Sequence, residues 1–90
     1  MAKAEISWKR ETTEGDKLQV YAHHVGDRWL FYARARRYHP WRCIEHPPLE
    51  DWLELLDAVE RRITRRLVRP EEAERIRKTM REQFPDAVIP

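Results

Sequence analysis

Glycine, serine and cysteine are scarce in this chain of 90 residues, which has two glycines, one serine (Ser7) and one cysteine (Cys43). Two glycines cannot form a Gly-x-Gly-x-x-Gly loop or a Walker loop, so nucleotide cradles of those kinds are excluded. A lone cysteine excludes an internal disulfide framework and favours a reducing compartment. Neither Ser7 nor Cys43 stands in the sequence context of a catalytic triad. We therefore expect no enzymatic activity, no catalytic residue and no cofactor.

Long apolar runs are lacking as well. No run approaches the roughly 18 residues of a membrane-spanning helix. The first residues, Met1–Ile6, do not contain the apolar segment of a signal peptide. Together with the single cysteine, these features predict a cytoplasmic protein.

Aromatic residues, in contrast, are plentiful: four Trp, three Tyr and two Phe. Disordered chains lack the aromatic area that offsets the entropy of chain ordering. Charged residues make up 38% and apolar residues 41% of the chain, which is a foldable balance. A chain of this length forms one domain, so we expect a single domain over residues 1–90.

Apolar residues recur at every second position in three stretches of the first half, separated by Glu14-Gly15-Asp16 and Gly26-Asp27. This period, broken by glycine-containing turns, is typical of an antiparallel meander. We expect a sheet over about residues 5–46. A fourth strand around Trp41–Glu45 is compatible with the pattern, but its facing is left open because Pro40 precedes it. The sheet therefore has three or four strands.

The turns predict the register of the strands. A two-residue loop at Gly26-Asp27 pairs Ala22 with Phe31 and Tyr21 with Tyr32. A three-residue loop at Glu14–Asp16 pairs Trp8 with Ala22. Either pairing keeps the apolar residues on one face, whereas a slip of one residue would mix the two faces.

The second half of the chain is typical of two helices. Pro47-Pro48 ends the sheet region, and the apolar residues that follow recur with a helical period over about residues 49–67. Pro70 begins a second helix that extends to about residue 84. The predicted fold class is α+β, with the antiparallel sheet packed on a C-terminal pair of helices.

The polar face of the predicted sheet is the candidate functional surface. Between Arg28 and Ile44 the chain has five arginines and no carboxylate. Arginines that bind phosphates, beside aromatic rings that stack on bases, are what a single-stranded nucleic-acid site requires. The candidate DNA- or RNA-binding residues on and beside this face are Lys9, Tyr21, His23, Tyr32, Arg34, Arg36, Arg37, Tyr38, Trp41 and Arg42.

Two other interpretations of this face stay open. One face of an antiparallel meander is commonly solvated without a ligand. Tyr, Trp and Arg are also the residues that dominate protein interfaces, so an acidic protein partner or a homodimer formed through Leu30 and Tyr32 would fit the same pattern. A protein-interaction or regulatory module is therefore the alternative to nucleic-acid binding.

Three further features of the sequence are each open to a functional and a structural interpretation. Glu60 falls within the apolar arc of the first helix, where it would act as an acid or base, or would pair with an arginine. His39, Cys43 and His46 have zinc-ligand chemistry without a familiar zinc spacing, so we expect no metal. Five arginines lie on the outer arc of the first helix and just after it, where they would be solvated or would meet an acidic partner. They are Arg61, Arg62, Arg65, Arg66 and Arg69.

The order of a basic aromatic meander, a proline-marked turn and the helical segment Leu49–Leu56 resembles a known class. It is similar in layout to single-stranded-DNA-binding domains of the Whirly, Pur-alpha and positive-cofactor coactivator type. The resemblance covers about Leu18–Ile63 and implies a four-stranded curved sheet that dimerises and binds nucleic acid. It departs at Cys43–Pro48, which replaces a Gly-Ile-Ser-Leu-type stretch of the coactivator domain. The second helix has no counterpart in the simplest of these domains.

Overall fold

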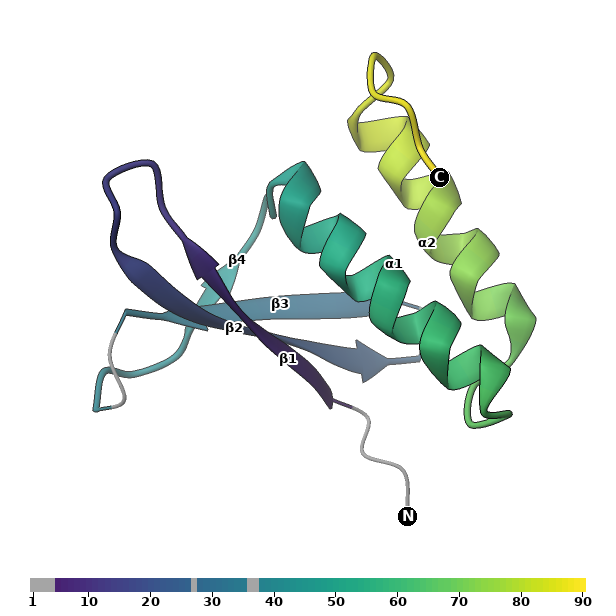
Figure 1. Ribbon diagram of the computed structural model, residues 1–90, viewed down its shortest axis with the longest axis horizontal. Coiled ribbons are helices and arrows are strands. Elements are labelled where there is room, and N and C mark those ends of the chain that lie inside the picture. The colour runs from purple at the N-terminus through teal and green to yellow at the C-terminus, as the bar shows by residue number, and fades with distance from the viewer. Residues whose placement is uncertain (1–4, 27, 36–37) are drawn as a thin grey trace. The chain divides into compact units, whose positions relative to one another are not determined.

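The computed structural model describes residues 5–26, 28–35 and 38–90. The chain forms two compact units, Met1–Pro47 and Pro48–Pro90. The first is an antiparallel sheet and the second is a pair of helices, so the predicted α+β class is confirmed (Figure 1). Asp27, Arg36 and Arg37, for which the sequence predicts a turn and two binding residues, lie outside the described residues.

The sheet has four strands: β1 (Glu5–Glu11), β2 (Lys17–Val25), β3 (Arg28–Arg34) and β4 (Arg42–Ile44). They pair in chain order and each pair is antiparallel, which is the predicted meander. The fourth strand is present and short. It pairs Ile44 with Phe31 and Cys43 with Tyr32.

The turn between β2 and β3 fixes the central register. Val25 pairs with Arg28, which leaves two residues in the loop, and Gly26 has a φ of 62°. This left-handed conformation is the one that glycine adopts without steric cost. The predicted pairs Ala22–Phe31 and Tyr21–Tyr32 are both confirmed.

The turn between β1 and β2 lies one residue earlier than predicted. The Thr12 amide donates to the Asp16 carbonyl at 2.8 Å, so the three loop residues are 13–15 rather than 14–16. Gly15, with a φ of 89°, therefore takes the last loop position, which favours a left-handed residue. Trp8 consequently pairs with Val20 and not with Ala22. A register change of two residues keeps every side chain on its predicted face.

The apolar face of the sheet holds the buried side chains of the first unit. Ile6, Val20, Ala22 and Phe31 are all buried. Trp8 packs its ring edge-on against Phe31 with 6.0 Å between ring centroids. This face is continuous across β1, β2 and β3 because directly paired residues point to the same side.

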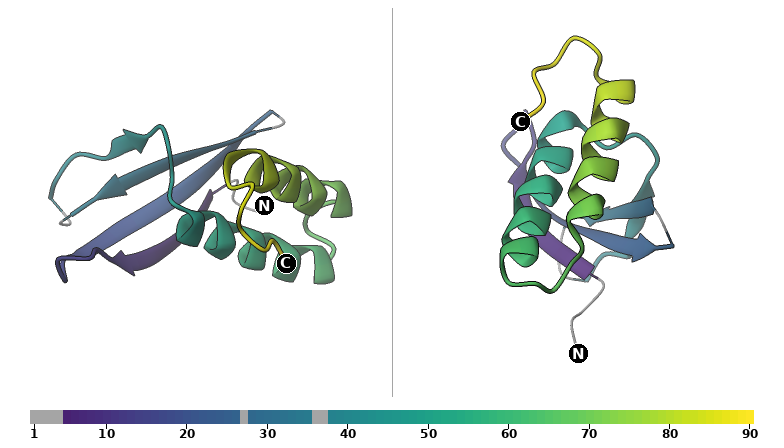
Figure 2. Two further views of the ribbon diagram at one scale, coloured as in Figure 1. Left: turned by 90° about the horizontal axis from the view of Figure 1, so that it is seen from above. Right: turned by 90° about the vertical axis from the view of Figure 1, so that its right-hand side faces the viewer.

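The second unit consists of α1 (Leu49–Thr64) and α2 (Pro70–Gln83), which lie side by side in both views of Figure 2. Its buried apolar side chains recur at helical spacing in each helix. They are Trp52, Leu55, Leu56, Val59, Ala73, Ile76 and Met80. Among the described residues, neither helix has the length and apolar character needed to cross a membrane.

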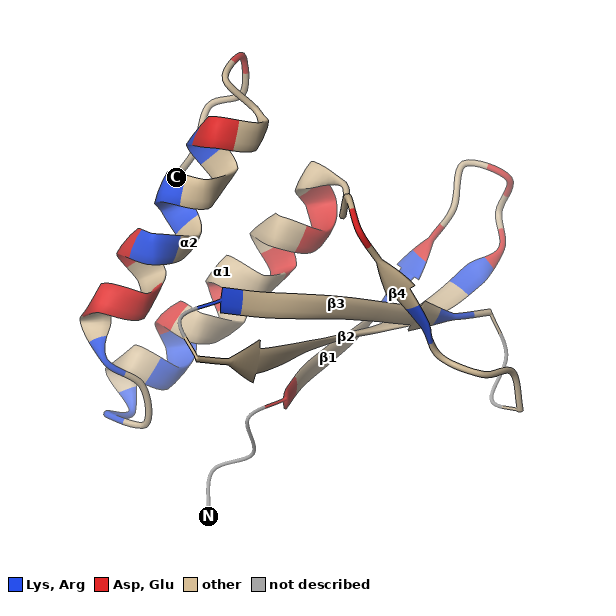
Figure 3. Cartoon of the chain, turned by 180° about the vertical axis from the view of Figure 1, so that it is seen from behind, with Lys and Arg blue, Asp and Glu red and all other residues tan. Residues whose placement is uncertain are grey.

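Helix α1 ends three residues before the predicted boundary at Leu67, in a Schellman motif. The Leu67 amide donates to the Arg62 carbonyl and the Arg66 amide to the Ile63 carbonyl, each at 2.9 Å. Arg66 occupies the left-handed position of this motif with a φ of 61°. Glycine is the usual residue there, because a side chain in this conformation costs about 1 kcal/mol or more. Figure 3 shows Lys and Arg segments gathered at this turn.

Glu60, which the sequence marks as the polar residue in the apolar arc, has a structural partner. Arg77 on α2 donates from one terminal nitrogen to Glu60 Oε1 and from the other to Glu74 Oε1 at 2.7 Å. Its Nε donates to the backbone oxygen of Pro90 at 2.8 Å. Arg77 thus joins α1, α2 and the segment after α2, and the arginine-pairing interpretation of Glu60 is confirmed.

Replacing the residue at the left-handed position tests the end of α1. We expect Arg66→Gly to raise the free energy of unfolding by about 0.5–1 kcal/mol, because glycine removes the steric cost but gains entropy in the unfolded chain. Thermal or urea unfolding of the full chain measures the change. Arg66→Ala keeps the steric cost and serves as the control, and equal stability of the two variants would contradict this account.

Removing the guanidinium of Arg77 tests the connection between the helices. We expect Arg77→Ala to lower the free energy of unfolding by about 1–2 kcal/mol, because three acceptors lose a charged donor. The Arg77 side chain is only 19% exposed, so water replaces these bonds incompletely. Arg81→Ala, at an exposed position of the same helix, should change stability by less than about 0.5 kcal/mol. A similar loss in both variants would contradict the assignment.

Candidate nucleic-acid interface

The face of the sheet opposite the apolar face carries most of the predicted binding residues. The strand register places on this side, named here the tyrosine face, residues that alternate with the buried ones. They include Ser7, Lys9, Gln19, Tyr21, His23, Leu30, Tyr32, Arg34 and Cys43. The polar face predicted from the sequence therefore exists on β1, β2 and β3, and β4 adds Cys43 to it.

Three aromatic side chains meet on the tyrosine face. Tyr21 and Tyr32, directly opposite on β2 and β3, stack with 4.9 Å between ring centroids and 18° between ring planes. Trp41, which precedes β4, packs edge-on against Tyr21 at 4.7 Å and 86°. Pairs with these geometries are worth about 0.5–1.5 kcal/mol beyond their buried area. The three rings therefore hold each other in place.

Arg34 on β3 completes the cluster. Its Nε donates to Gln19 Oε1 on β2 at 2.7 Å, and its guanidinium carbon lies 4.2 Å from the centroid of the Trp41 ring. The hydrogen bond to Gln19 orients the guanidinium plane of Arg34, and the face of the Trp41 ring attracts the positive charge of the guanidinium. We name Tyr21, Tyr32, Trp41 and Arg34 the aromatic–arginine cluster.

The contact between Gln19 and Arg34 could have been predicted from the sequence. The predicted pairing of Tyr21 with Tyr32 also makes Gln19 the cross-strand neighbour of Arg34, as the structure has it. Gln19 was not among the predicted site residues. The signal was a polar side chain, able to accept a hydrogen bond, directly opposite an arginine.

The environment of Tyr21 favours its neutral phenol. Partial burial raises the pKa of Tyr21 above its usual value of about 10, and the negative charges of ionised Tyr32, Glu5 and Cys43 raise this pKa further. Tyr21 is therefore a hydrogen-bonding and stacking group at neutral pH, with no tendency to ionise.

The remaining predicted residues occupy different surroundings. Lys9 is exposed on β1. His23 Nδ1 lies 3.6 Å from the Glu5 carboxylate, so a protonated His23 would already face a negative charge. Tyr38 is 92% exposed.

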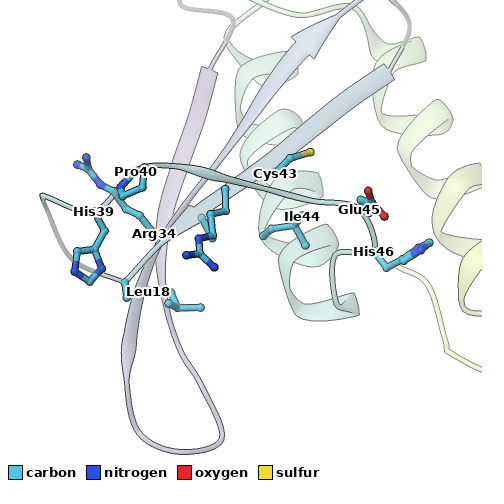
Figure 4. Close-up of a pocket in the computed structure, with 11 residues that line it drawn as sticks. Leu18, Arg34, His39, Pro40, Cys43, Ile44, Glu45 and His46 are labelled. Atoms are coloured by element: carbon cyan, nitrogen blue, oxygen red, sulfur yellow. The ribbon is translucent and has the colours of Figure 1, made fainter.

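Arg42 is not brought to the tyrosine face. It pairs with Ala33, so its side chain belongs to the apolar face, on the same side as Ile44. Both line an open hollow near the β3–β4 connection together with Leu18, Ala33 and Ala35 (Figure 4). In Figure 4, Cys43 points away from β4 on the side opposite Ile44, as the alternation of the strand requires.

The same hollow is bordered by His39, Cys43, Glu45 and His46, the residues with metal-ligand chemistry. His39 and His46 lie at opposite ends of it, with the length of β4 between them (Figure 4). In the described part of the chain, no three His, Cys, Asp or Glu side chains converge closely enough to hold a metal ion.

No protein-family model, curated protein or solved structure matches this chain. The resemblance to the Whirly, Pur-alpha and coactivator class therefore stays a prediction. Function has to be inferred from the surface chemistry of the described residues.

Alkaline titration tests the environment of Tyr21. The fold favours the neutral phenol, so its contribution to stability is complete below pH 10 and is lost as the pH rises through the raised pKa. We expect a tyrosine absorbance step that begins above the unfolded value and that disappears in Tyr21→Phe. The Tyr21→Phe variant should also be less sensitive to alkaline unfolding than the parent. Persistence of the most alkaline step in Tyr21→Phe would contradict this assignment.

Proposed function

We propose that this protein binds single-stranded DNA or RNA on the tyrosine face, without enzymatic activity. The observation that carries the proposal is the Arg34 guanidinium 4.2 Å over the Trp41 ring, which itself packs edge-on against Tyr21 of the stacked Tyr21–Tyr32 pair. An oriented cation beside aromatic rings is the combination that contacts a phosphate and a neighbouring base together.

The cluster and its surroundings differ in what they can offer a ligand. Tyr21 and Tyr32 already stack on each other, and Tyr21 also packs against the edge-on Trp41 ring, so their role is to hold Trp41 in position. Trp41 retains 37% exposure and Tyr38 is almost fully exposed. These two rings are therefore the ones on which bases would stack, and Arg34, which lies over the Trp41 ring, would contact a neighbouring phosphate.

The charge of the tyrosine face favours an anionic ligand. The register puts Lys9, Lys17, Arg28 and Arg34 on this side of the sheet, against the carboxylates Glu5 and Glu11. The cations are spread over three strands, so a backbone that runs across the strands would pass several of them.

Tyr38 is the most informative residue to change, since its ring is exposed and its loss should leave the fold intact. We expect Tyr38→Ala to weaken binding of a short oligo(dT) or oligo(rU) by about 5- to 150-fold, which corresponds to one lost base stack of about 1–3 kcal/mol. Quenching of tryptophan fluorescence at about 50 and 300 mM salt measures affinity and its salt dependence. Val88→Ala, which removes an apolar side chain that is 94% exposed, is the matched control.

The variant Arg34→Gln tests the electrostatic contribution to binding in the same titrations. Loss of one phosphate contact should reduce the slope of log affinity against log salt by about 0.7 for a single strand. No binding by the parent protein at the lower salt would remove nucleic acid as the ligand. Salt-independent self-association, reduced by substitutions on the tyrosine face, would instead point to a homodimer.

A further inference from the structure

The turn between α1 and α2 carries a second basic surface, remote in sequence from the tyrosine face. Five arginines lie in nine residues there. Arg61 forms an exposed ion pair with Asp57 at 3.2 Å, one helical turn away. Arg65, Arg66 and Arg69, which we name the arginine turn, are all exposed.

Helix electrostatics account for only part of this cluster. Arg61 and Arg62 are in the last turn of α1, where cations interact favourably with the negative helix end. Arg66 and Arg69 lie beyond α1. Arg69 is the N-cap of α2, where Ser, Thr, Asp or Asn is preferred, and its side chain forms no capping hydrogen bond. A cation is also unfavourable at the positive N-terminal end of α2.

Two local rules are therefore broken within four residues, and both times by arginine. Glycine would fit the left-handed backbone at Arg66, and a small polar residue would cap α2 at Arg69. Such local conflicts are expected where a side chain serves a function rather than the fold. The conflict does not arise from crowding in the core, because both side chains are exposed.

An apolar side chain lies between these arginines. Leu67 is 55% exposed and immediately follows Arg66. The side chains of Arg65, Arg66 and Arg69 form no salt bridge among the described residues, so their guanidinium forks are open to solvent. The arginine turn thus combines three exposed cationic side chains with an exposed leucine that lies between them in the sequence.

We propose that the arginine turn binds an acidic segment of a protein partner, with carboxylates on the guanidinium forks and an apolar side chain against Leu67. Guanidinium and carboxylate groups pair through two parallel hydrogen bonds. A phosphate backbone would contact only the arginines, whereas a polypeptide can also place an apolar side chain against Leu67, and this favours a polypeptide partner. The proposal does not depend on nucleic-acid binding by the tyrosine face.

The test uses the two residues that break the local rules. In the full chain, Arg66→Gly and Arg69→Ser should each raise the thermal midpoint, because each restores the locally preferred residue. The double variant should nevertheless bind a synthetic peptide of about six Asp and Glu residues around one leucine some three- to tenfold more weakly than the parent, the loss expected for two exposed ion pairs. NMR titration with the peptide at millimolar concentration measures the affinity.

Arg81→Ser is the matched control, since it removes one exposed arginine from the last turn of α2. Equal loss of peptide affinity in Arg81→Ser and in the single arginine-turn variants would overturn the proposal, as would the absence of binding to the parent. Replacing the leucine of the peptide by serine should weaken binding. Unchanged affinity would contradict the apolar contact with Leu67 and would leave charge attraction as the only basis of binding. If oligo(dT) affinity falls in the double variant while peptide affinity does not, the surface belongs to nucleic acid.

The same measurements distinguish this proposal from the one for the tyrosine face. Tyr38→Ala should leave peptide affinity unchanged, and the arginine-turn variants should leave the fluorescence change with oligo(dT) unchanged. If one of the two proposals is wrong, only the variants of that site will give an unexpected affinity, and the variants of the other site will still test the other proposal.

Discussion

The two-residue turn at Gly26 is the constraint on which the sheet surface depends. Val25 pairs directly with Arg28, and each further pair along β2 and β3 follows from that closure. It sets Tyr21 opposite Tyr32 and Gln19 opposite Arg34. A slip of one residue would separate the tyrosines onto opposite faces and leave Arg34 without its acceptor. The aromatic–arginine cluster is therefore a consequence of turn geometry, and it needs no long-range packing beyond the arrival of Trp41.

If the tyrosine face binds a ligand as proposed, preorganisation favours this cluster over the same residues on an unordered loop. Arg34 is held by Gln19 on one side and Trp41 on the other, so little rotamer entropy is left to lose on binding. Tyr38 is the opposite case, because its ring is almost fully exposed. In the proposed site, an oriented arginine would anchor one phosphate and an exposed ring would admit different bases, which is the behaviour of a site without strong sequence preference.

The elements that the sequence predicts well are those governed by local chemistry. The alternation of apolar and polar residues predicts the strands and their faces, and the two-residue turn at Gly26 predicts the β2–β3 register. The β1–β2 loop lies one residue earlier than the alternation of apolar residues predicts, because Gly15 takes the last loop position, where a left-handed residue is favoured. The end of α1 was misplaced because apolar spacing continues to Leu67, whereas the Schellman bonds stop the helix earlier. Contacts between distant segments, such as Trp41 with Tyr21 or Arg77 with Glu60, depend on backbone paths that periodicity does not specify.

The sequence alone does not distinguish the arginines from one another, but in the structure they have three different physical roles. Arg77 is mostly buried and bonded to three acceptors, so its charge belongs to the fold. Arg34 is partly buried and oriented, so its charge is presented in a fixed direction. Arg66 and Arg69 are exposed at positions that prefer other residues, so neither packing nor helix stability explains them. Net charge alone, which is only +2, conceals these differences. The arginines that neither pack in the core nor stabilise a helix therefore indicate the chemistry of a binding partner better than the total number of arginines does.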